Sequence, residues 1–481
     1  MRSMRWQWLL PLVCWPCSAH LFAGPGPESG VRRLYVEAFA TKTGSEVLRA
    51  DLTAELRKLS SISLVPDAAS ADLVLGGGGE IWVKGYRSFS PRSHIKMPSN
   101  GMPIYGGFLS VELRNRRSVT IWSYLAAPEK TSENVSKDIS KRIATHLAEA
   151  LKEPETPALA SQQRPTITLS GAGATFPFPV YQKWFTNFQA EDPRTAITYD
   201  AVGSETGIKN LLAGKVDFGA SDNPEAINQL APGDESEYLL FPSVVGAVVP
   251  IVNVPGIPES IAFTPEALAG IFLGKITKWN DPILRRANRG LELPDLDIVV
   301  VHRVDGSGTS YAWTDYLSKT SPEWKDQIGA SLTPKWPIGR AATGNDGVAK
   351  LVKELGGSIG YVEFIYAVQN HLSYGRIRNR NGEYVEASLE SIAAAVGHSQ
   401  GLRDDLKGSI VDAPGEGSYP LASFTWIVVP AHIRDDTKRG AITTFLKWML
   451  GPGQRQAAAL GYLALPREVV SREEAAIAGI H

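Results

Sequence analysis

The sequence predicts an α/β protein with more than one domain. Its 481 residues exceed what one hydrophobic core usually accommodates, and about three cores of typical size would account for them. Short apolar segments alternate with helical ones, and twice an apolar strand leads through a glycine-rich turn into the start of a helix. Hydrophobic residues make up 43% and charged residues 21%, which is typical of soluble globular proteins with buried cores.

The first residues have the order of a secretory signal peptide. Arg2 and Arg5 precede an apolar run over 6–15, and small residues follow up to Ala23. A membrane anchor is the alternative, but the run is shorter than the roughly 20 residues that a spanning helix needs. We therefore expect residues 1–23 to be removed on export and the mature protein to be periplasmic.

Composition excludes several classes of function. Both cysteines, Cys14 and Cys17, lie in the predicted signal peptide, so the mature chain would have no disulfide, catalytic thiol or cysteine-ligated metal. The formal net charge of −1 lacks the basic excess that binding to a nucleic-acid backbone requires. We expect no nucleic-acid partner, no bound metal and no cofactor.

Residues 30–152 are predicted to form a small, separate α/β domain of unknown role. Strands are expected at 34–36 and 62–65, a helix at 45–59 and a hairpin turn at 115–117. A last helix is indicated by an apolar stripe at Val135, Ile139, Ile143, Leu147 and Leu151.

Two segments of this region are expected to be irregular. The four glycines at 76–79 are interpreted as a flexible turn, since no Lys-Ser or Lys-Thr pair and no helix follow as in a phosphate-binding loop. The stretch 153–165 contains three prolines without periodicity, which is typical of an interdomain linker. The second domain is expected to occupy 166–481.

This second domain opens with a strand, a glycine turn and a helix. The turn reads Gly-Ala-Gly-Ala-Thr-Phe-Pro at 171–177, and a helical pattern follows over 180–188. Glycines expose backbone N–H groups, which together with the Thr175 hydroxyl and the positive end of a helix can hold an anion. A purely structural turn would explain the same residues.

Two more clusters combine glycines with hydroxyl groups. Ser204 stands where a helix is expected to begin, although helix capping alone would explain it. The run Arg-Val-Asp-Gly-Ser-Gly-Thr-Ser at 303–310 follows an apolar strand and precedes another expected helix. It contains a guanidinium group, flexible backbone donors and hydroxyls, which together can surround a tetrahedral oxyanion.

An acid, Asp222, ends the strand-like run Val-Asp-Phe-Gly-Ala-Ser-Asp between these clusters. An ionised aspartate only accepts hydrogen bonds, so beside a bound anion it needs a ligand that can donate one. Phosphate keeps at least one proton near neutral pH, whereas sulfate has none. Asp222 would therefore favour phosphate and repel sulfate. Considered alone, the same residue would be interpreted as a helix-cap or turn residue.

Together these motifs resemble the periplasmic phosphate-binding proteins of the phosphate-specific ABC transport system. GAGATFP, VDFGASD and RVDGSGTS occur in that family's order, along with FLGKITKW, KWPIG, GNDG and GYVE. The resemblance covers 166–481 and implies a type II periplasmic-binding-protein fold, with two lobes hinged on two crossover strands. Lobe I would comprise about 166–248 and 425–481, and lobe II about 249–424.

The resemblance also implies which residues hold the ligand from lobe I. Thr175 and Phe176 would donate backbone N–H groups, and Thr175 and Ser204 would also donate their hydroxyls. Asp222 would accept the proton of the ligand.

From lobe II, Arg303 would supply the positive charge and would be held in place by Asp305. Ser307, Gly308 and Thr309 would complete the shell. The implied function is high-affinity binding of inorganic phosphate by a monomer, which delivers it to the membrane permease of an ABC transporter.

The chain reads Gly-Ser-Glu-Thr-Gly at 203–207, where the family commonly has Gly-Ser-Ser-Gly-Gly, so Glu205 places an additional acid next to Ser204. We expect its side chain to face solvent in the first turn of a helix.

A phosphatase or other phosphoryl-ester hydrolase is the alternative function. However, the eight histidines are scattered, and Ser307 does not lie in a Gly-x-Ser-x-Gly elbow. His302 is a candidate general base. Neighbouring residues on a strand point to opposite faces, so if Arg303 faces the cleft, the His302 side chain points away from it. We therefore expect a binding protein without enzymatic activity.

Overall fold

The computed structural model describes residues 31–39, 42–88, 101–116, 118, 120–128, 134–152, 166–257, 260–399 and 406–481. The predicted signal peptide, 1–23, and the predicted linker, 153–165, lie outside these residues. None of the helices in the described part of the chain is long and apolar enough to cross a membrane.

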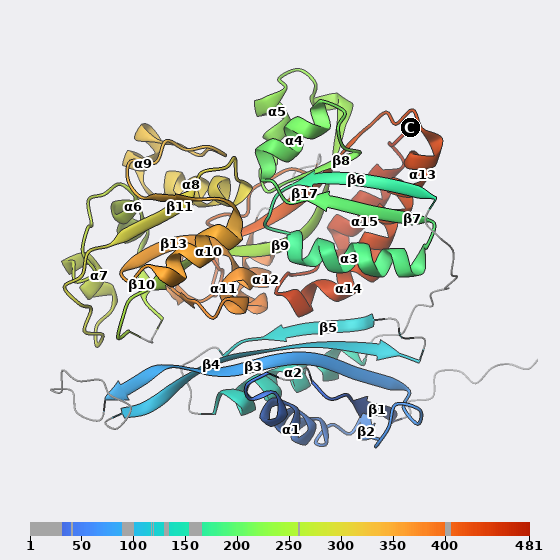
Figure 1. Ribbon diagram of the computed structural model, residues 1–481, viewed down its shortest axis with the longest axis horizontal. Coiled ribbons are helices and arrows are strands. Elements are labelled where there is room, and N and C mark those ends of the chain that lie inside the picture. The colour runs from blue at the N-terminus through green and yellow to red at the C-terminus, as the bar shows by residue number, and fades with distance from the viewer. Residues whose placement is uncertain are drawn as a thin grey trace, which may run out of the picture.

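Residues 31–152, hereafter the front unit, contain a five-stranded sheet with two helices on one face (Figure 1). The strand order is β2-β1-β3-β4-β5. The strands are β1 (Arg32–Val36), β2 (Ile62–Leu64), β3 (Leu73–Ser88), β4 (Gly101–Asn115) and β5 (Thr120–Ala126). The helices α1 (Ser45–Leu56) and α2 (Val135–Ala150) pack their apolar residues on the sheet.

Most elements predicted for the front unit are confirmed. The first two strands and the hairpin of β4 and β5 lie where they are expected, and α2 buries the predicted apolar stripe from Val135 to Leu147. Helix α1 ends at Leu56 rather than at residue 59. Whether the front unit is a domain in its own right stays a prediction.

The glycine run at 76–79 is not a turn, and that prediction is wrong. These residues lie inside β3 and pair with Leu109 to Glu112 of β4. A Cβ atom on Gly77 would come within 2.4 Å of the Ser110 carbonyl oxygen, and one on Gly79 within 2.5 Å of that of Phe108. The glycines thus allow a close approach of two strands, which a sequence pattern alone does not distinguish from a turn.

Residues 166–481 form two lobes joined by long shared strands (Figure 1). Strand β9 pairs with β17 up to Ala247 and with β13 from Val248 onward, so it passes from one half of the sheet into the other. The sheet order is β12-β11-β13-β9-β17-β8-β6-β7, with β14 paired to β9. We call the half around β6 to β8 lobe I and the half around β11 to β13 lobe II.

The strands of the lobes are β6 (Ile167–Gly173), β7 (Thr195–Asp200), β8 (Phe218–Ser221), β9 (Tyr238–Asn253), β10 (Ala262–Phe263), β11 (Val299–Arg303), β12 (Arg340–Ala342), β13 (Ser358–Glu363), β14 (Ser373–Tyr374), β15 (Arg376–Arg378), β16 (Tyr384–Val385) and β17 (Ala422–Pro430). The helices are α3 (Phe178–Glu191), α4 (Ser204–Leu212), α5 (Ala226–Leu230), α6 (Pro265–Phe272), α7 (Pro282–Ala287), α8 (Gly308–Thr320), α9 (Pro322–Gln327), α10 (Gly344–Glu354), α11 (Phe364–Gln369), α12 (Leu389–His398), α13 (Asp436–Trp448), α14 (Gln454–Ala457) and α15 (Arg467–Ile477). Short helical segments are η2 (Glu235–Glu237), η3 (Met449–Gly453) and η4 (Ala458–Leu460).

The core explains why these segments fold as they do. Strand β9 is apolar along nearly its whole length and is buried on both faces, as expected of an interior strand covered by helices. Helix α3 buries one aromatic face, in which Tyr181, Trp184 and Phe188 are almost fully inaccessible. This packing fixes the strand ends from which the site is built.

We predict that Gly207→Ala destabilises the protein by about 1–3 kcal/mol, because α4 packs directly on β6. A Cβ atom on Gly207 would lie 2.1 Å from the Gly173 Cα atom. Urea denaturation of the variant provides the measurement. Gly440→Ala is the control, since that exposed glycine in α13 has open space around its Cβ position and alanine favours a helix. Equal stability of the two variants would contradict the packing described.

Candidate anion-binding site

The structure brings together the predicted site residues of both lobes. Thr175 lies between β6 and α3, Ser204 begins α4, and Asp222 follows β8 in lobe I. Arg303 ends β11 and faces them from lobe II, next to the start of α8. The predicted residues are all buried: Thr175, Phe176, Ser204, Asp222, Arg303, Ser307, Gly308 and Thr309.

The centre of positive charge is Arg303, whose side chain is only 1% exposed. Its Nε donates to Asp305 Oδ1 at 2.7 Å, and its Nη2 pairs with the other carboxylate oxygen. The backbone N–H of Gly344 also donates to Asp305, at 3.1 Å. Burial alone would raise the pKa of Asp305, but the hydrogen bonds and charge of Arg303 lower it overall. Asp305 is therefore ionised and fixes the guanidinium plane.

The guanidinium group also reaches across to lobe I. Arg303 Nη1 donates to Thr175 Oγ1 at 3.3 Å. The Thr175 side chain thus lies beside Arg303, and its predicted contact with a bound ligand stays a prediction.

Ser204 connects the lobes and does not cap its helix, so the capping interpretation is wrong. The N-cap position belongs to Gly203, which has a φ of 91°. The Ser204 hydroxyl oxygen accepts from the Gly308 N–H at 3.0 Å and from the Asp222 N–H at 3.4 Å. A Cβ atom on Gly308 would lie 2.5 Å from this oxygen and 2.4 Å from Asp222 Oδ2. Only glycine allows this approach, which holds the lobes closed.

Asp222 is a buried carboxylate with one satisfied oxygen. Its Oδ1 accepts from the Thr425 hydroxyl at 2.5 Å, whereas its Oδ2 has no hydrogen-bond partner in the part of the chain that the structure describes. Burial raises the pKa of Asp222 to about 7, although the Thr425 hydrogen bond and the charge of Arg303 oppose this change. The site therefore contains a buried acceptor beside a buried cation.

Asn345 belongs to the site although it was not predicted. Its side-chain amide donates to Thr175 Oγ1 at 2.8 Å and to Thr309 Oγ1 at 3.3 Å. Its carbonyl oxygen accepts from the Glu363 N–H at 3.0 Å. The GNDG motif that contains it stands out in the sequence, but its spacing from the other clusters gave no reason to assign it a role.

Two other supporting contacts also escape prediction. The Tyr366 hydroxyl donates to the Thr175 carbonyl oxygen at 2.7 Å, and the Tyr462 hydroxyl donates to that of Phe176 at 2.6 Å. The ring of Phe176 packs against Tyr462 and the backbone of Gly246. Phe176 can therefore contribute to the site only through its backbone.

Glu205 lies at the rim of the contact between the lobes, so the expectation that it faces solvent is wrong. Its N–H donates to the Gly306 carbonyl oxygen of lobe II at 3.1 Å. Its side chain is 22% exposed, rests on Gly306 and forms an ion pair with Lys209 at 2.6 Å. Lys209 compensates the additional negative charge beside the site.

Ser307 and His302 have structural contacts. The Ser307 hydroxyl oxygen accepts from the Ser310 N–H at 3.1 Å and so caps α8. The ring of His302 stacks on Trp336 with centroids 5.0 Å apart, and its Nδ1 lies 3.1 Å from the Arg303 carbonyl oxygen. As strand alternation predicts, His302 points away from the Arg303 side chain.

Comparison with known proteins agrees with this geometry. A family model described as a PBP superfamily domain matches residues 155–452, more than half of the chain. The phosphate-binding protein PstS of Xylella fastidiosa (strain Temecula1) is 41% identical over 322 residues, which are 66% of this chain and 87% of that protein. The chain belongs to the PstS family. PstS of Pasteurella multocida (strain Pm70) is 40% identical over 310 residues, 64% of this chain and 89% of its own.

Solved structures show the same fold at lower identity. The periplasmic phosphate-binding protein PfluDING is 21% identical with a TM-score of 0.53, and the match covers 64% of this chain and 93% of that one. A DING protein has 22% identity and a TM-score of 0.51, with 64% and 94% covered. The predicted type II periplasmic-binding-protein fold is thus confirmed. The family model begins at residue 155 and does not cover the front unit.

The raised pKa of Asp222 predicts how stability depends on pH. The folded protein favours the neutral acid, so this contribution is fully present below the ordinary aspartate pKa of about 4 and is lost as the pH rises through about 7. Without added oxyanions, the free energy of unfolding of Asp222→Asn should rise by on the order of 2 kcal/mol relative to that of the unchanged protein when the pH is raised from about 5 to about 8. Urea denaturation at both pH values measures this difference. A constant difference would contradict the buried, unpaired state of this carboxyl group.

Proposed function

We propose that this protein binds inorganic phosphate between its lobes in the periplasm and delivers it to the permease of an ABC-type phosphate transporter. The observation that carries the proposal is Asp222 Oδ2, a buried acceptor without a protein partner among the described residues, in the same closed site as the Arg303 guanidinium. A cation favours an anion, and an unpaired acceptor favours a ligand that still carries a proton. Phosphate meets both requirements.

The other site residues have matching roles in this proposal. Arg303, oriented by Asp305, provides the main counter-charge for the bound anion. The Ser204 and Thr309 hydroxyls and backbone N–H groups at the starts of α4 and α8 surround it, where helix dipoles favour negative charge. Asn345 keeps the Thr175 and Thr309 hydroxyls in position.

The relatives and the predicted signal peptide support the proposed role in transport and the proposed location. The PstS relatives are named phosphate-binding proteins, and PfluDING is described as periplasmic. We propose the same location for this chain, as a monomer without a cofactor. The closed form would dock on the permease, and opening of the lobes there would release the ligand.

The hydrolase alternative has no specific observation in its favour. His302 is occupied by its stacking on Trp336, and Ser307 caps a helix. Release of phosphate from a chromogenic phosphomonoester, if lost in Ser307→Ala, would nevertheless show that the protein is an enzyme.

Binding of phosphate and sulfate across pH tests the proposal directly. At about pH 8, an ionised Asp222 should accept the phosphate proton and repel sulfate, so phosphate should bind far more tightly. Near pH 5 a protonated Asp222 can donate to sulfate, so the preference should shrink. Asp222→Asn should bind sulfate better at about pH 8 and lose most of the pH dependence. Calorimetry on ligand-stripped protein measures both affinities, and no phosphate binding or equal affinity for sulfate would contradict the function.

Arg303→Ala should weaken phosphate binding by about 2–5 kcal/mol, because the bound anion loses its counter-charge and Asp305 loses its cationic partner. Arg194→Ala is the control, as this arginine is 65% exposed and pairs with its near neighbour Asp192. The same calorimetric titration measures both variants. Equal affinities would contradict the assigned role of Arg303.

A further inference from the structure

The front unit contacts both lobes through the sheet face that its helices leave uncovered, and lobe II also through α2. Side chains alternate along a strand, so Leu75 and Ile81 of β3 face α1 and α2, while Glu80 and Trp82 face the lobes. In Figure 1 the long strands β3 and β4 extend along both lobes, and β5 lies next to α14. The phosphate site lies on the other side of the lobes, near α4 and α8.

Lobe I is held by polar contacts from β4 and β5. Glu112 forms an ion pair with Lys183 of α3 at 3.0 Å. The Ser110 hydroxyl donates to the Ala459 carbonyl oxygen at 2.8 Å. The Ser123 hydroxyl donates to the Arg455 carbonyl oxygen at 2.7 Å and accepts from the Ala459 N–H at 3.2 Å.

Lobe II is held by an aromatic contact. Trp82 stacks on His371 with ring centroids 4.2 Å apart, and Glu80 Oε2 lies 3.2 Å from His371 Nε2. His371 has a φ of 58°, a left-handed conformation that costs a non-glycine residue about 1–2 kcal/mol. The hydrogen bonds that end α11 fix this conformation, because the His371 N–H donates to the Val368 carbonyl oxygen and the Leu372 N–H to that of Ala367.

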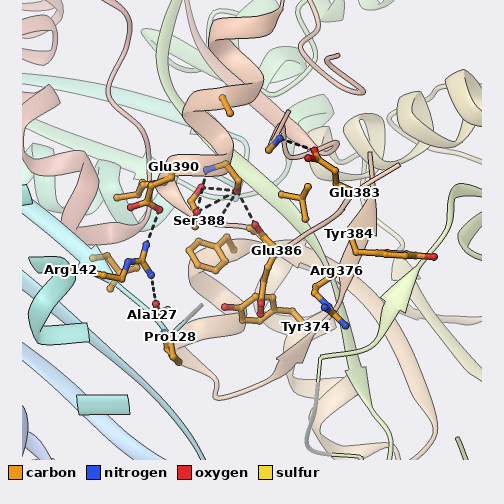
Figure 2. Close-up of a pocket in the computed structure, with 18 residues that line it drawn as sticks. Ala127, Pro128, Arg142, Tyr374, Arg376, Glu383, Tyr384, Glu386, Ser388 and Glu390 are labelled. Carbon is orange, nitrogen blue, oxygen red and sulfur yellow. Dashed lines mark hydrogen bonds and ion pairs between the residues drawn. The ribbon is translucent and has the colours of Figure 1, made fainter. Parts of the chain in front are cut away.

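A second contact with lobe II centres on Glu390. Its carboxylate pairs with Arg142 at 2.8 Å, lies 3.1 Å from His146 Nε2 and accepts from the Tyr124 hydroxyl. Figure 2 shows Arg142 between Glu390 and Ala127, beside a pocket of about 510 Å³. Burial would raise the pKa of Glu390, but the hydrogen bond from Tyr124 and the charge of Arg142 lower it to about 2. The Glu390 carboxylate is therefore ionised and binds the front unit through several polar contacts.

Two of these contacts are far apart along the β3–β4 pair, whereas Ser123 and Tyr124, which contact lobe I and lobe II, are neighbours on β5. Glu112 stands opposite Gly76 in the β3–β4 register, and Trp82 lies about 20 Å further along β3 at the usual rise per residue. At these two contacts the strand pair touches lobe I through Glu112 and lobe II through Trp82.

We infer that the front unit is an intramolecular brace that docks on both lobes only when they are closed, and thereby strengthens phosphate binding and slows phosphate release. This inference rests on the proposed function. Hinge opening moves one lobe relative to the other, so a rigid sheet cannot keep both sets of contacts. The structure has them together with the closed lobes, in which Gly308 N–H reaches Ser204. Contacts made only in the closed state shift the equilibrium toward it.

The full-length double variant Trp82→Ala/Arg142→Ala removes contacts with lobe II. We expect phosphate to dissociate faster and its Kd to rise about tenfold, within the usual range of such coupling. Glu112→Ala/Ser123→Ala, which removes contacts with lobe I, should act in the same direction. Arg33→Ala is the control. The Arg33 side chain is 47% exposed, and its ion pair with Asp72 lies within the front unit. Calorimetry and stopped-flow displacement measure Kd and the dissociation rate.

Each result has a distinct meaning. If the unchanged protein does not bind phosphate, the proposed function fails. If it binds phosphate and either double variant keeps its Kd and dissociation rate, the brace is wrong while the function stands.

Reciprocity provides a second measurement that needs no variant. If front-unit docking favours closure, saturating phosphate must strengthen docking by the same factor. Amide hydrogen exchange of the unchanged protein should then slow at 80–83 and 455–461 when phosphate is added. Exchange that is unchanged there, while it slows at the site residues, would overturn the brace.

Discussion

The closed form depends on the buried Arg303 guanidinium and its pairing with Asp305. A charge this deeply buried is costly unless it is paired and hydrogen-bonded. Asp305 satisfies two of its nitrogens and the Thr175 hydroxyl a third. Because Thr175 belongs to lobe I and Arg303 to lobe II, the electrostatic centre of the site also joins the two halves of the molecule.

Local patterns in the sequence predicted much of this site. Polar groups at the ends of strands or helices were predicted from three patterns: the run from Arg303 to Ser310, the first glycine turn and Asp222. The structure brings these groups together. Asn345, Tyr366 and Thr425 were not predicted, because each acts through contacts with residues distant from it in the sequence. Ser204 was predicted as a site residue, but the hydrogen bond between its hydroxyl and the Gly308 N–H of the other lobe has no local signal in the sequence.

In the front unit, the features that the sequence did not predict depend on long-range packing. A run of four glycines reads as a turn by local propensity, yet β4 pairs with it residue by residue. Predicting the strand would require knowledge of the partner strand, which lies beyond a stretch without a clear pattern. Nor does a proline-rich stretch indicate that the sheet before it packs on the lobes after it. The hydrophobic stripe of α2, in contrast, is a local signal and was predicted correctly.

The arrangement of front unit and lobes in one chain has a kinetic consequence. A tethered surface meets its partner at an effective concentration on the order of millimolar, so weak individual contacts suffice to keep it docked. The Trp82–His371 stack and the few ion pairs around Glu390 are interactions of this kind. Such contacts break and re-form rapidly, so the tether can lengthen the residence time of a captured anion without trapping it.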